Sequence, residues 1–291
     1  MTVPQAAEAH DDALTPTGPP RVDTGTRPRE EDIERSFDRI LAEGQPRLHR
    51  SVPDLLATGG TAGMEVTLGV LALLYVDQQT GSGLLGGLAF SIGFIALRLG
   101  HSELFTEGFL VPVTVVVAGG ARFRHLIRFW VGTLIGNLAG GWLVAWLIME
   151  AFPTLHRTAI ETGTYYIHGG INGRTFCLGL LGGSAITLLT RMHNGTDSEM
   201  AKLMASVGIA FLLAGVRLFH SVLDSLFAFT AFAAGRAPFG YLDWLGWFAW
   251  AVLGNLVGGL ALTSVLRLVR SRHRVVDHRV ANERPVPRRS A

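Results

Sequence analysis

The chain has 291 residues, of which 48% are hydrophobic and only 16% are charged, and this composition excludes an ordinary soluble globular protein. The formal net charge is +2 at pH 7, but the arginines lie beside long apolar runs, as in membrane proteins, and this pattern excludes nucleic acid as a partner. The single cysteine, Cys177, excludes a disulfide framework and a cysteine-rich metal site. We therefore expect a helical membrane protein that holds no metal and no cofactor.

Residues 1–50 are predicted to form a cytoplasmic tail. Residues 1–28 are polar and contain prolines, which predicts disorder. Residues 29–44 predict a short amphipathic surface helix, because apolar side chains recur there at helical spacing: Ile33, Phe37, Ile40 and Leu41. No signal peptide is visible, so we expect the first apolar run to act as its own insertion signal. Residues 51–270 are predicted to form a transmembrane channel domain, and residues 271–291 a basic cytoplasmic tail.

Six apolar runs follow one another between short polar joints, at 55–76, 84–118, 125–151, 173–192, 200–235 and 241–269. A helix needs roughly 20 apolar residues to cross a bilayer. The second and fifth runs are too long for one crossing, and polar residues interrupt both of them. The sequence thus predicts six transmembrane helices, of which the second and fifth are broken.

Basic residues predict the orientation of these helices. Arg47 and Arg50 precede the first run, arginines at 122–128 join the second and third, and Arg191 and Lys202 join the fourth and fifth. Arginines are enriched in cytoplasmic loops. We therefore expect a multi-pass protein of the inner membrane with both termini in the cytoplasm.

An internal repeat is visible in the sequence. Arg98-Leu-x-His101-Ser-x-Leu recurs as Arg217-Leu-x-His220-Ser-x-Leu, at an offset of 119 residues (217 − 98). The sequence Gly-Asn-Leu-x-Gly-Gly occurs around Asn137 and again, 118 residues later, around Asn255. Each unit contains three predicted helices, and an odd number sends the second unit into the membrane from the opposite side. The chain is thus predicted to consist of two inverted three-helix repeats, with a substrate site where the broken helices meet. The glycines beside the asparagines favour close helix packing over a direct role in function.

The ionisable residues near the breaks allow two interpretations. Arg98 and His101 share a helix face, as do Arg217 and His220, and these two basic patches would attract anions. Alternatively the arginines pair internally and clamp the breaks. Their possible partners are Glu103, Glu107 and Asp224.

His220 also allows two interpretations. A histidine in a narrow channel can titrate near neutral pH and pass a proton to a weak-acid anion, which crosses an apolar constriction more easily when neutral. Alternatively, it is a neutral histidine that bonds the backbone at a helix break. Aromatic residues lie around both breaks and would form hydrophobic constrictions or simply pack the core; they are Phe105, Phe109, Phe219, Phe227 and Phe229.

The sequence Glu103-Leu104-Phe105-Thr106 at the first break and His220-Ser221 at the second resemble the formate/nitrite transporter family, and so do the Gly-Asn pairs. The resemblance covers roughly residues 50–270. It implies an aquaporin-like fold and a homopentamer with one pore per protomer for small monovalent anions such as formate, nitrite or hydrosulfide. It also implies that His220 is the central pore histidine and Thr106 the loop threonine. The chain departs from the family pattern at Phe219, which precedes the histidine, and at Asp224, which stands near the position of an asparagine.

The preferred interpretation is a channel for small monovalent anions, either passive or coupled to protons. Arg98 and Arg217 would draw in the anion, His220 would protonate it or bond to it, and His101 and Thr106 would assist. Asn137 and Asn255 are also expected to line the pore. A non-transporting membrane protein on the same scaffold is one alternative, and a channel for neutral solutes or weak bases is another. No nucleophile, metal set or cofactor loop is visible, so we do not expect an enzyme.

Overall fold

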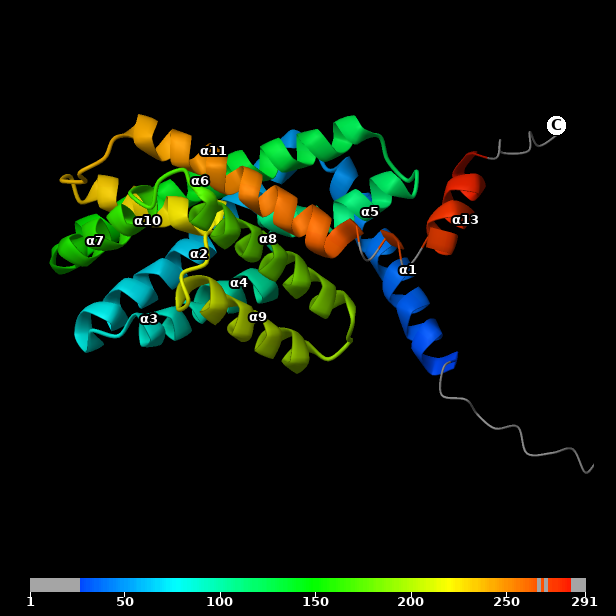
Figure 1. The fold of residues 1–291 in the computed structure, drawn as a ribbon, viewed down its shortest axis with the longest axis horizontal. Coiled ribbons are helices and arrows are strands. Elements are labelled where there is room, and N and C mark those ends of the chain that lie inside the picture. The colour runs from blue at the N-terminus through cyan, green and yellow to red at the C-terminus, as the bar shows by residue number, and fades with distance from the viewer. Residues whose placement is uncertain (1–26, 266–267, 270–271, 284–291) are drawn as a thin grey trace, which may run out of the picture.

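The two overlong apolar runs are each divided in the three-dimensional structure. The computed structural model describes residues 27–265, 268–269 and 272–283, and every regular element within them is a helix (Figure 1). In chain order the elements are α1 (Arg27–His49), α2 (Val52–Thr80), α3 (Gly83–Ala89), α4 (Ser91–Gly100), the 3₁₀ turn η1 (Phe105–Phe109), α5 (Val111–Val117), α6 (Phe123–Ala151), the 3₁₀ turn η2 (Pro153–Leu155), α7 (His156–Ile167), α8 (Gly173–Asn194), α9 (Glu199–Ala214), α10 (Ser221–Ala233), α11 (Tyr241–Val257), the π-helical stretch η3 (Gly258–Val265) and α13 (Arg272–Glu283).

Five helical stretches among the described residues are long and apolar enough to cross a membrane: Val52–Thr80, Gly83–Gly100, Phe123–Ala151, Gly173–Asn194 and Tyr241–Ala261. The second apolar run supplies one of them and then continues, after a break, as the shorter apolar helix Phe105–Val117. The fifth run is divided into α9 and α10, of 16 and 13 residues. Both breaks consist of a few residues between two helical arms, so backbone groups that a continuous helix would pair need other partners.

Asn137 supplies those partners at the first break. Its side-chain nitrogen on α6 donates to the carbonyl oxygens of Gly59 on α2 and of Glu103, both at 2.9 Å. Its side-chain oxygen accepts the N–H of Phe105 at 2.8 Å. One buried amide thus ties the break to α2 and α6.

Asn255 on α11 makes the same three bonds at the second break. Its nitrogen donates to the carbonyl oxygens of Gly179 on α8 and of Phe219, both at 2.9 Å, and its oxygen accepts the N–H of Ser221 at 2.8 Å. Both asparagines are fully buried. The two repeat units therefore fix their breaks by equivalent contacts, and the side-chain amides expected to line a pore are engaged with backbone.

Small residues let the helices of each unit approach closely, as the sequence predicted. A Cβ atom added at Gly63 on α2 would collide with the carbonyl oxygen of Asn137, and one added at Gly183 on α8 would collide with that of Asn255. Only glycine leaves room for these contacts.

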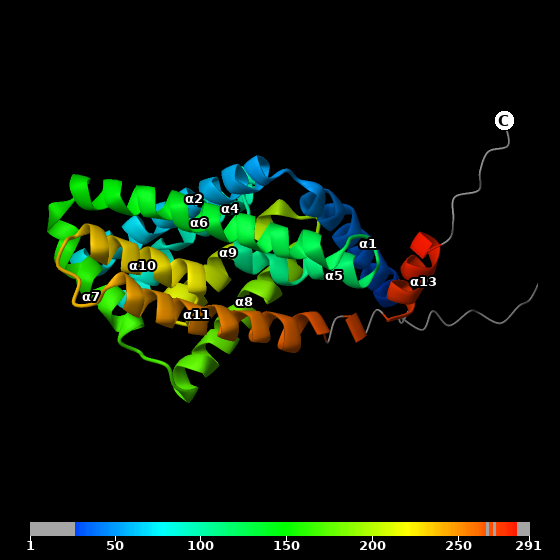
Figure 2. The same cartoon turned by 90° about the horizontal axis from the view of Figure 1, so that it is seen from above.

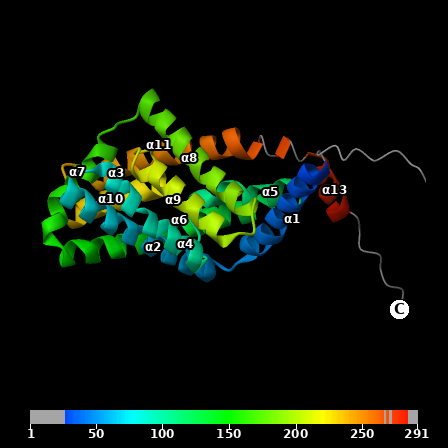
Figure 3. The same cartoon turned by 90° about the horizontal axis from the view of Figure 1, so that it is seen from below.

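The ends of the described chain meet at one end of the molecule. Figure 1 places α1 and α13 there and α7 at the opposite end, and the views from above and below agree (Figures 2 and 3). Phe37 and Ile40 are buried, and Ile40 packs against Leu110 and Val111, so α1 lies against the helical body. The helix expected over residues 29–44 is longer than expected, and the basic C-terminal tail contains a helix of its own, α13. The predicted disorder of residues 1–26 lies outside the described residues.

Candidate functional site

The two breaks meet at a contact between Thr106 and His220. Thr106 lies in η1, and His220 is the N-cap residue of α10. Thr106 Oγ1 and His220 Nε2 are 2.8 Å apart, and the two side chains are 0% and 1% exposed. This hydrogen bond thus joins the two breaks directly in the buried centre of the molecule.

The backbone decides which ring nitrogen of His220 carries the proton. The N–H of Leu223 points at Nδ1 from 3.0 Å, and a backbone N–H can only donate. Nδ1 is therefore an acceptor, and the neutral ring carries its proton on Nε2, from where it donates to Thr106 Oγ1. If Nδ1 also carried a proton, its N–H would face the N–H of Leu223, and two donors cannot form a hydrogen bond with each other. This geometry matches the second interpretation of His220, a neutral histidine that bonds the backbone at a helix break.

Asp224 belongs to the same turn of α10. Its Oδ2 accepts the N–H of His220 at 2.9 Å, so the two residues cap the helix reciprocally. The carboxylate is fully buried. Its Oδ1 and the hydroxyl of Ser221 have no hydrogen-bond partner among the described residues.

The two arginines lie apart, and neither pairs as the clamp alternative expected. Arg98 donates to both carboxylate oxygens of Glu199, at 3.1 Å each, instead of bonding Glu103, Glu107 or Asp224. This partner comes from the start of α9, a helix that sequence proximity could not connect with α4.

Arg217 lies elsewhere, with its guanidinium 4.6 Å from the centre of the Tyr165 ring. Tyr165 belongs to α7, at the end of the molecule opposite α1 (Figure 1). Arg98 instead lines a cavity beside α1. The two arginines of the expected basic patches thus contact different parts of the protein.

The sequence match at offset 119 is not the structural correspondence of the two breaks. His101 and Arg217 both have a left-handed backbone, with φ of 55° and 60°, at an offset of 116 residues. The bonds of Asn137 and Asn255 pair Phe105 with Ser221, again 116 residues apart. His101 is therefore not the counterpart of His220. Its ring is exposed and bonds the carbonyl oxygen of Leu99 at 2.9 Å.

The phenylalanines named from the sequence are buried in aromatic clusters. Phe105, Phe109 and Trp130 form edge-to-face pairs, with the Phe105 and Phe109 ring centres 5.2 Å apart. In a second cluster, the ring centre of Tyr166 lies 5.5 Å from that of Phe219 and 5.3 Å from that of Phe227. Phe229 packs against Trp244 at 5.2 Å.

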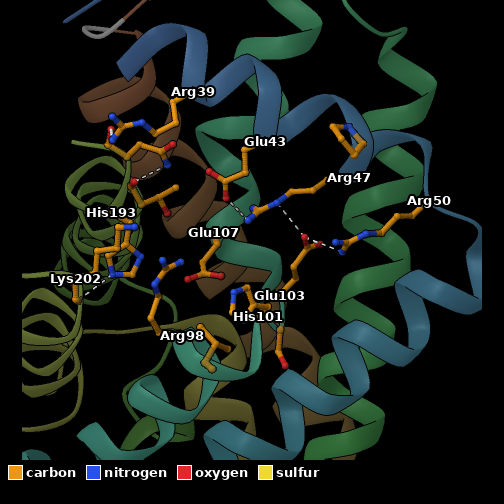
Figure 4. Close-up of a pocket in the computed structure, with 15 residues that line it drawn as sticks. Arg39, Glu43, Arg47, Arg50, Arg98, His101, Glu103, Glu107, His193 and Lys202 are labelled. Atoms are coloured by element: carbon orange, nitrogen blue, oxygen red, sulfur yellow. Dashed lines mark hydrogen bonds and ion pairs between the residues drawn. The ribbon is translucent and has the colours of Figure 1, made fainter. Parts of the chain in front are cut away.

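A cavity of about 360 Å³ lies beside the first break and is covered by α1 (Figure 4). Its wall is strongly charged and comes from α1, the end of α4, the first break, the end of α8 and the start of α9. The charged and histidine side chains that line it are Arg39, Glu43, Arg47, Arg50, Arg98, His101, Glu103, Glu107, His193 and Lys202.

Glu103 is the centre of the ion pairs in this wall. It is 2% exposed, and its Oε1 lies 3.0 Å from Arg47 Nε and 2.8 Å from Arg50 Nη1. Burial lowers the pKa of Arg47, but the carboxylates of Glu103, Glu43 and Glu107 outweigh it and hold that pKa above its ordinary value. The sequence indicates Arg47 and Arg50 only as orientation signals. Glu103 is also named from the sequence, but as a possible partner of Arg98 or Arg217 and not of Arg47 and Arg50. The structural counterpart of Glu103 at the second break is Phe219.

The described residues contain no cluster of three or more His, Cys, Asp or Glu side chains suited to a metal ion. The site therefore consists of one buried hydrogen bond with aromatic walls and, next to it, a charged cavity.

Several known proteins are similar to this chain. It is 25% identical to the inner membrane protein YfdC of Escherichia coli K12 over 260 residues, which cover 85% of this chain and 81% of the relative. It is 26% identical to the formate channel FocA of the same strain over 235 residues, or 68% of this chain and 80% of FocA.

Two solved structures share the fold. A protein described as an FNT family ion channel matches with a TM-score of 0.72 and 19% identity, covering 81% of this chain and 98% of its own. A pentameric formate channel with formate bound matches with a TM-score of 0.64 and 21% identity, covering 76% and 98%. The family model described as Formate/nitrite transporter matches residues 34–269. With this match over most of its length, the chain belongs to the formate/nitrite transporter family.

Proposed function

We propose that this protein is a channel for small monovalent weak-acid anions such as formate, with its constriction at the Thr106–His220 contact. It would act in the inner membrane as a homopentamer with one pore per protomer, both termini in the cytoplasm and its two three-helix units inverted. A formate channel among the relatives at 26% identity and a pentameric formate channel of the same fold support this proposal.

The observation that carries the proposal is the buried hydrogen bond between the two breaks. When Thr106 and His220 separate, the Nε2–H of His220 and the hydroxyl of Thr106 are both free to donate to an anion between them. The rings of Phe105 and Phe219, next in sequence to these two residues, add an apolar wall. Two donors in an apolar passage suit a small anion or its neutral acid, because each donor replaces part of the lost hydration.

The test is flux through liposomes that contain the purified full-length protein. Formate, nitrite, acetate, chloride and hydrosulfide would be compared at acidic and neutral pH, with His220→Ala as the variant. We expect selective flux in the wild type and a loss of roughly tenfold or more in the variant, since one hydrogen bond to an anion contributes about 1.5–3 kcal/mol.

His156→Ala is the matched control, because the ring of His156 on α7 bonds the carbonyl oxygen of Met149, away from the two breaks. It should conduct like the wild type. A wild type that carries no anion faster than empty liposomes would refute the channel.

A non-transporting scaffold is the second candidate, and the closed Thr106–His220 contact favours it. The curated relative YfdC is named only as an inner membrane protein. Absence of flux in the assay would support this candidate, whereas flux indifferent to the identity of the anion would support a channel for neutral solutes.

A further inference from the structure

Glu107 differs from the other charged groups in the wall of the α1 cavity. Each cation there has a carboxylate partner: Arg39 bonds Asp197, Arg47 bonds Glu43 and Glu103, Arg50 bonds Glu103, and Arg98 and Lys202 bond Glu199. Glu107 has no cation within 4.0 Å among the described residues. Its only hydrogen bond there is from the N–H of Leu104, at 3.5 Å.

Glu107 also lies at the boundary between the cavity and the buried centre. It lines the cavity and is half-buried, whereas its neighbour Thr106 is fully buried against His220. Both residues belong to η1, a 3₁₀ turn in which successive side chains point about 120° apart. One turn of chain therefore directs a hydroxyl to the constriction and a carboxyl to the cavity, and Figure 4 shows the Glu107 side chain within the ring of charged residues.

The charged surroundings of Glu107 come from four helices and the first break. The side chains that face the same cavity are Arg39, Glu43 and Arg47 on α1, Arg50 just after α1, Arg98 and His101 at the end of α4, Glu103 in the break, His193 on α8 and Lys202 on α9. The two histidines are bonded to backbone oxygens, of Leu99 and of Lys202. The other two carboxylates of this wall, Glu43 and Glu103, are paired with arginines, so Glu107 is the carboxylate in this wall that has no ion-pair partner among the described residues.

His220 is poorly placed to supply a proton to a passing anion. Its only ring proton is on Nε2, and the N–H of Leu223 occupies Nδ1. Giving up the Nε2 proton would leave an anionic ring in a buried site. A proton for the anion must therefore come from another group near the constriction.

We propose that Glu107 is the proton-exchanging group of this channel, which transfers its proton to a weak-acid monoanion in the α1 cavity before the acid reaches Thr106 and His220. The O–H bond of Glu107 breaks as an O–H bond forms on the anion, and the resulting carboxylate then takes up a proton from the bathing solution. In the opposite direction Glu107 takes the proton from the emerging acid. This inference rests on the proposed channel function.

The experiment measures formate uptake and proton uptake together in liposomes with an internal pH dye, for the full-length protein at several pH values. We expect the wild type to carry about one proton with each formate, and Glu107→Gln to reduce proton uptake per formate about tenfold or more, as removal of a general acid does. Glu107→Asp keeps a carboxyl and should keep the coupling. Glu43→Gln neutralises a carboxylate of the same cavity that is already bonded to Arg47, and it should also keep the coupling.

The outcomes separate the two proposals. Formate flux in the wild type with unchanged proton uptake in Glu107→Gln would overturn the role of Glu107 and leave the channel standing. No formate flux in the wild type would overturn the channel, and with it the transfer of a proton to an anion.

Infrared difference spectra during a pH titration give a readout that does not depend on flux. We expect one carboxylic acid C=O band of the wild type to be missing in Glu107→Gln, and its presence there would contradict the assignment.

Discussion

At the scale of single residues, the Thr106–His220 bond makes a prediction about stability. Thr106→Ala leaves the Nε2–H of His220 buried without an acceptor. A buried donor without a partner costs about 1–3 kcal/mol, so the free energy of unfolding should fall by that amount. Thr106→Ser keeps the hydroxyl and should lie closer to the wild type. Unfolding of the purified protein in mixed detergent micelles measures both, and equal stability of the two variants would show that the methyl group of Thr106 matters and its hydroxyl does not.

Thr106 and His220 could be named from the sequence, but the tautomer of His220 and the hydrogen bond between the two residues could not. His220 and Thr106 were identified by motif. The tautomer depends on the N–H of Leu223, and that bond exists only because α10 begins at His220. The partner of Arg98 was unpredictable for a similar reason, since Glu199 comes close only when α9 packs beside α4.

At the scale of elements, the two asparagines predict matched losses of stability in the two units. Asn137→Ala removes three hydrogen bonds from the first break, and Asn255→Ala removes three from the second. Each leaves buried backbone groups without partners, at about 1–3 kcal/mol per group, so neither variant should retain a cooperative unfolding transition like that of the wild type.

Asn172→Ala is the matched control for both asparagines. Asn172 caps α8 by accepting the N–H of Thr175 at 3.1 Å, and loss of such a cap costs about 1 kcal/mol. If Asn137→Ala or Asn255→Ala cost no more than this control, the breaks would not depend on the amide ties.

The repeat shows where sequence reasoning about elements succeeds and where it fails. Both breaks fall within the two overlong apolar runs, because polar residues at membrane depth need partners that a continuous helix does not give. The register at the breaks was wrong by three residues. The letters Arg-Leu-x-His-Ser occur in both units, but the asparagine bonds and the left-handed residues align the breaks at 116 and not at 119. Matching residue types in the two units therefore predicted the structurally equivalent positions less well than the position of each residue relative to its break did.

The contact between α1 and α13 predicts a weak, salt-sensitive junction. Arg274 bonds both oxygens of Asp38, at 2.6 and 2.7 Å, but the two side chains are 34% and 52% exposed. Exposed ion pairs contribute about 1 kcal/mol or less, so Asp38→Ala should speed amide hydrogen exchange in α13 by no more than about fivefold. High salt should have the same effect on the wild type. Asp54→Ala, on α2, is the control, and an exchange rate in α13 unmoved by Asp38→Ala would mean that apolar packing alone holds the helix.

At the scale of the whole molecule, the two units share a scaffold but differ in charge. The first break carries Glu103 at the position where the second carries Phe219, since both backbone oxygens bond the equivalent asparagine. At this position, therefore, the first break has a carboxylate that can form ion pairs with basic residues of α1, and the second break does not. Arg47 on α1 and Arg50 just after it form ion pairs with Glu103, and α1 lies over this end of the molecule (Figure 1). At the second break, Phe219 instead packs against the aromatic ring of Tyr166 on α7.

This asymmetry predicts that Glu103→Gln loosens α1 without unfolding the helical body. Breaking a buried ion pair costs about 3–5 kcal/mol, but Arg47 and Arg50 are 20% and 33% exposed and water can reach them, so we expect about 1–2 kcal/mol. That change raises the open population of α1 about 5- to 30-fold, and trypsin cleavage after Arg47 and Arg50 should accelerate accordingly. Glu161→Gln, which removes the partner of the exposed Arg157 on α7, should leave this cleavage unchanged. If Glu103→Gln also left it unchanged, the other attachments of α1 would be what holds it in place, namely the packing of Ile40 on Leu110 and Val111 and the bond from Arg39 to Asp197.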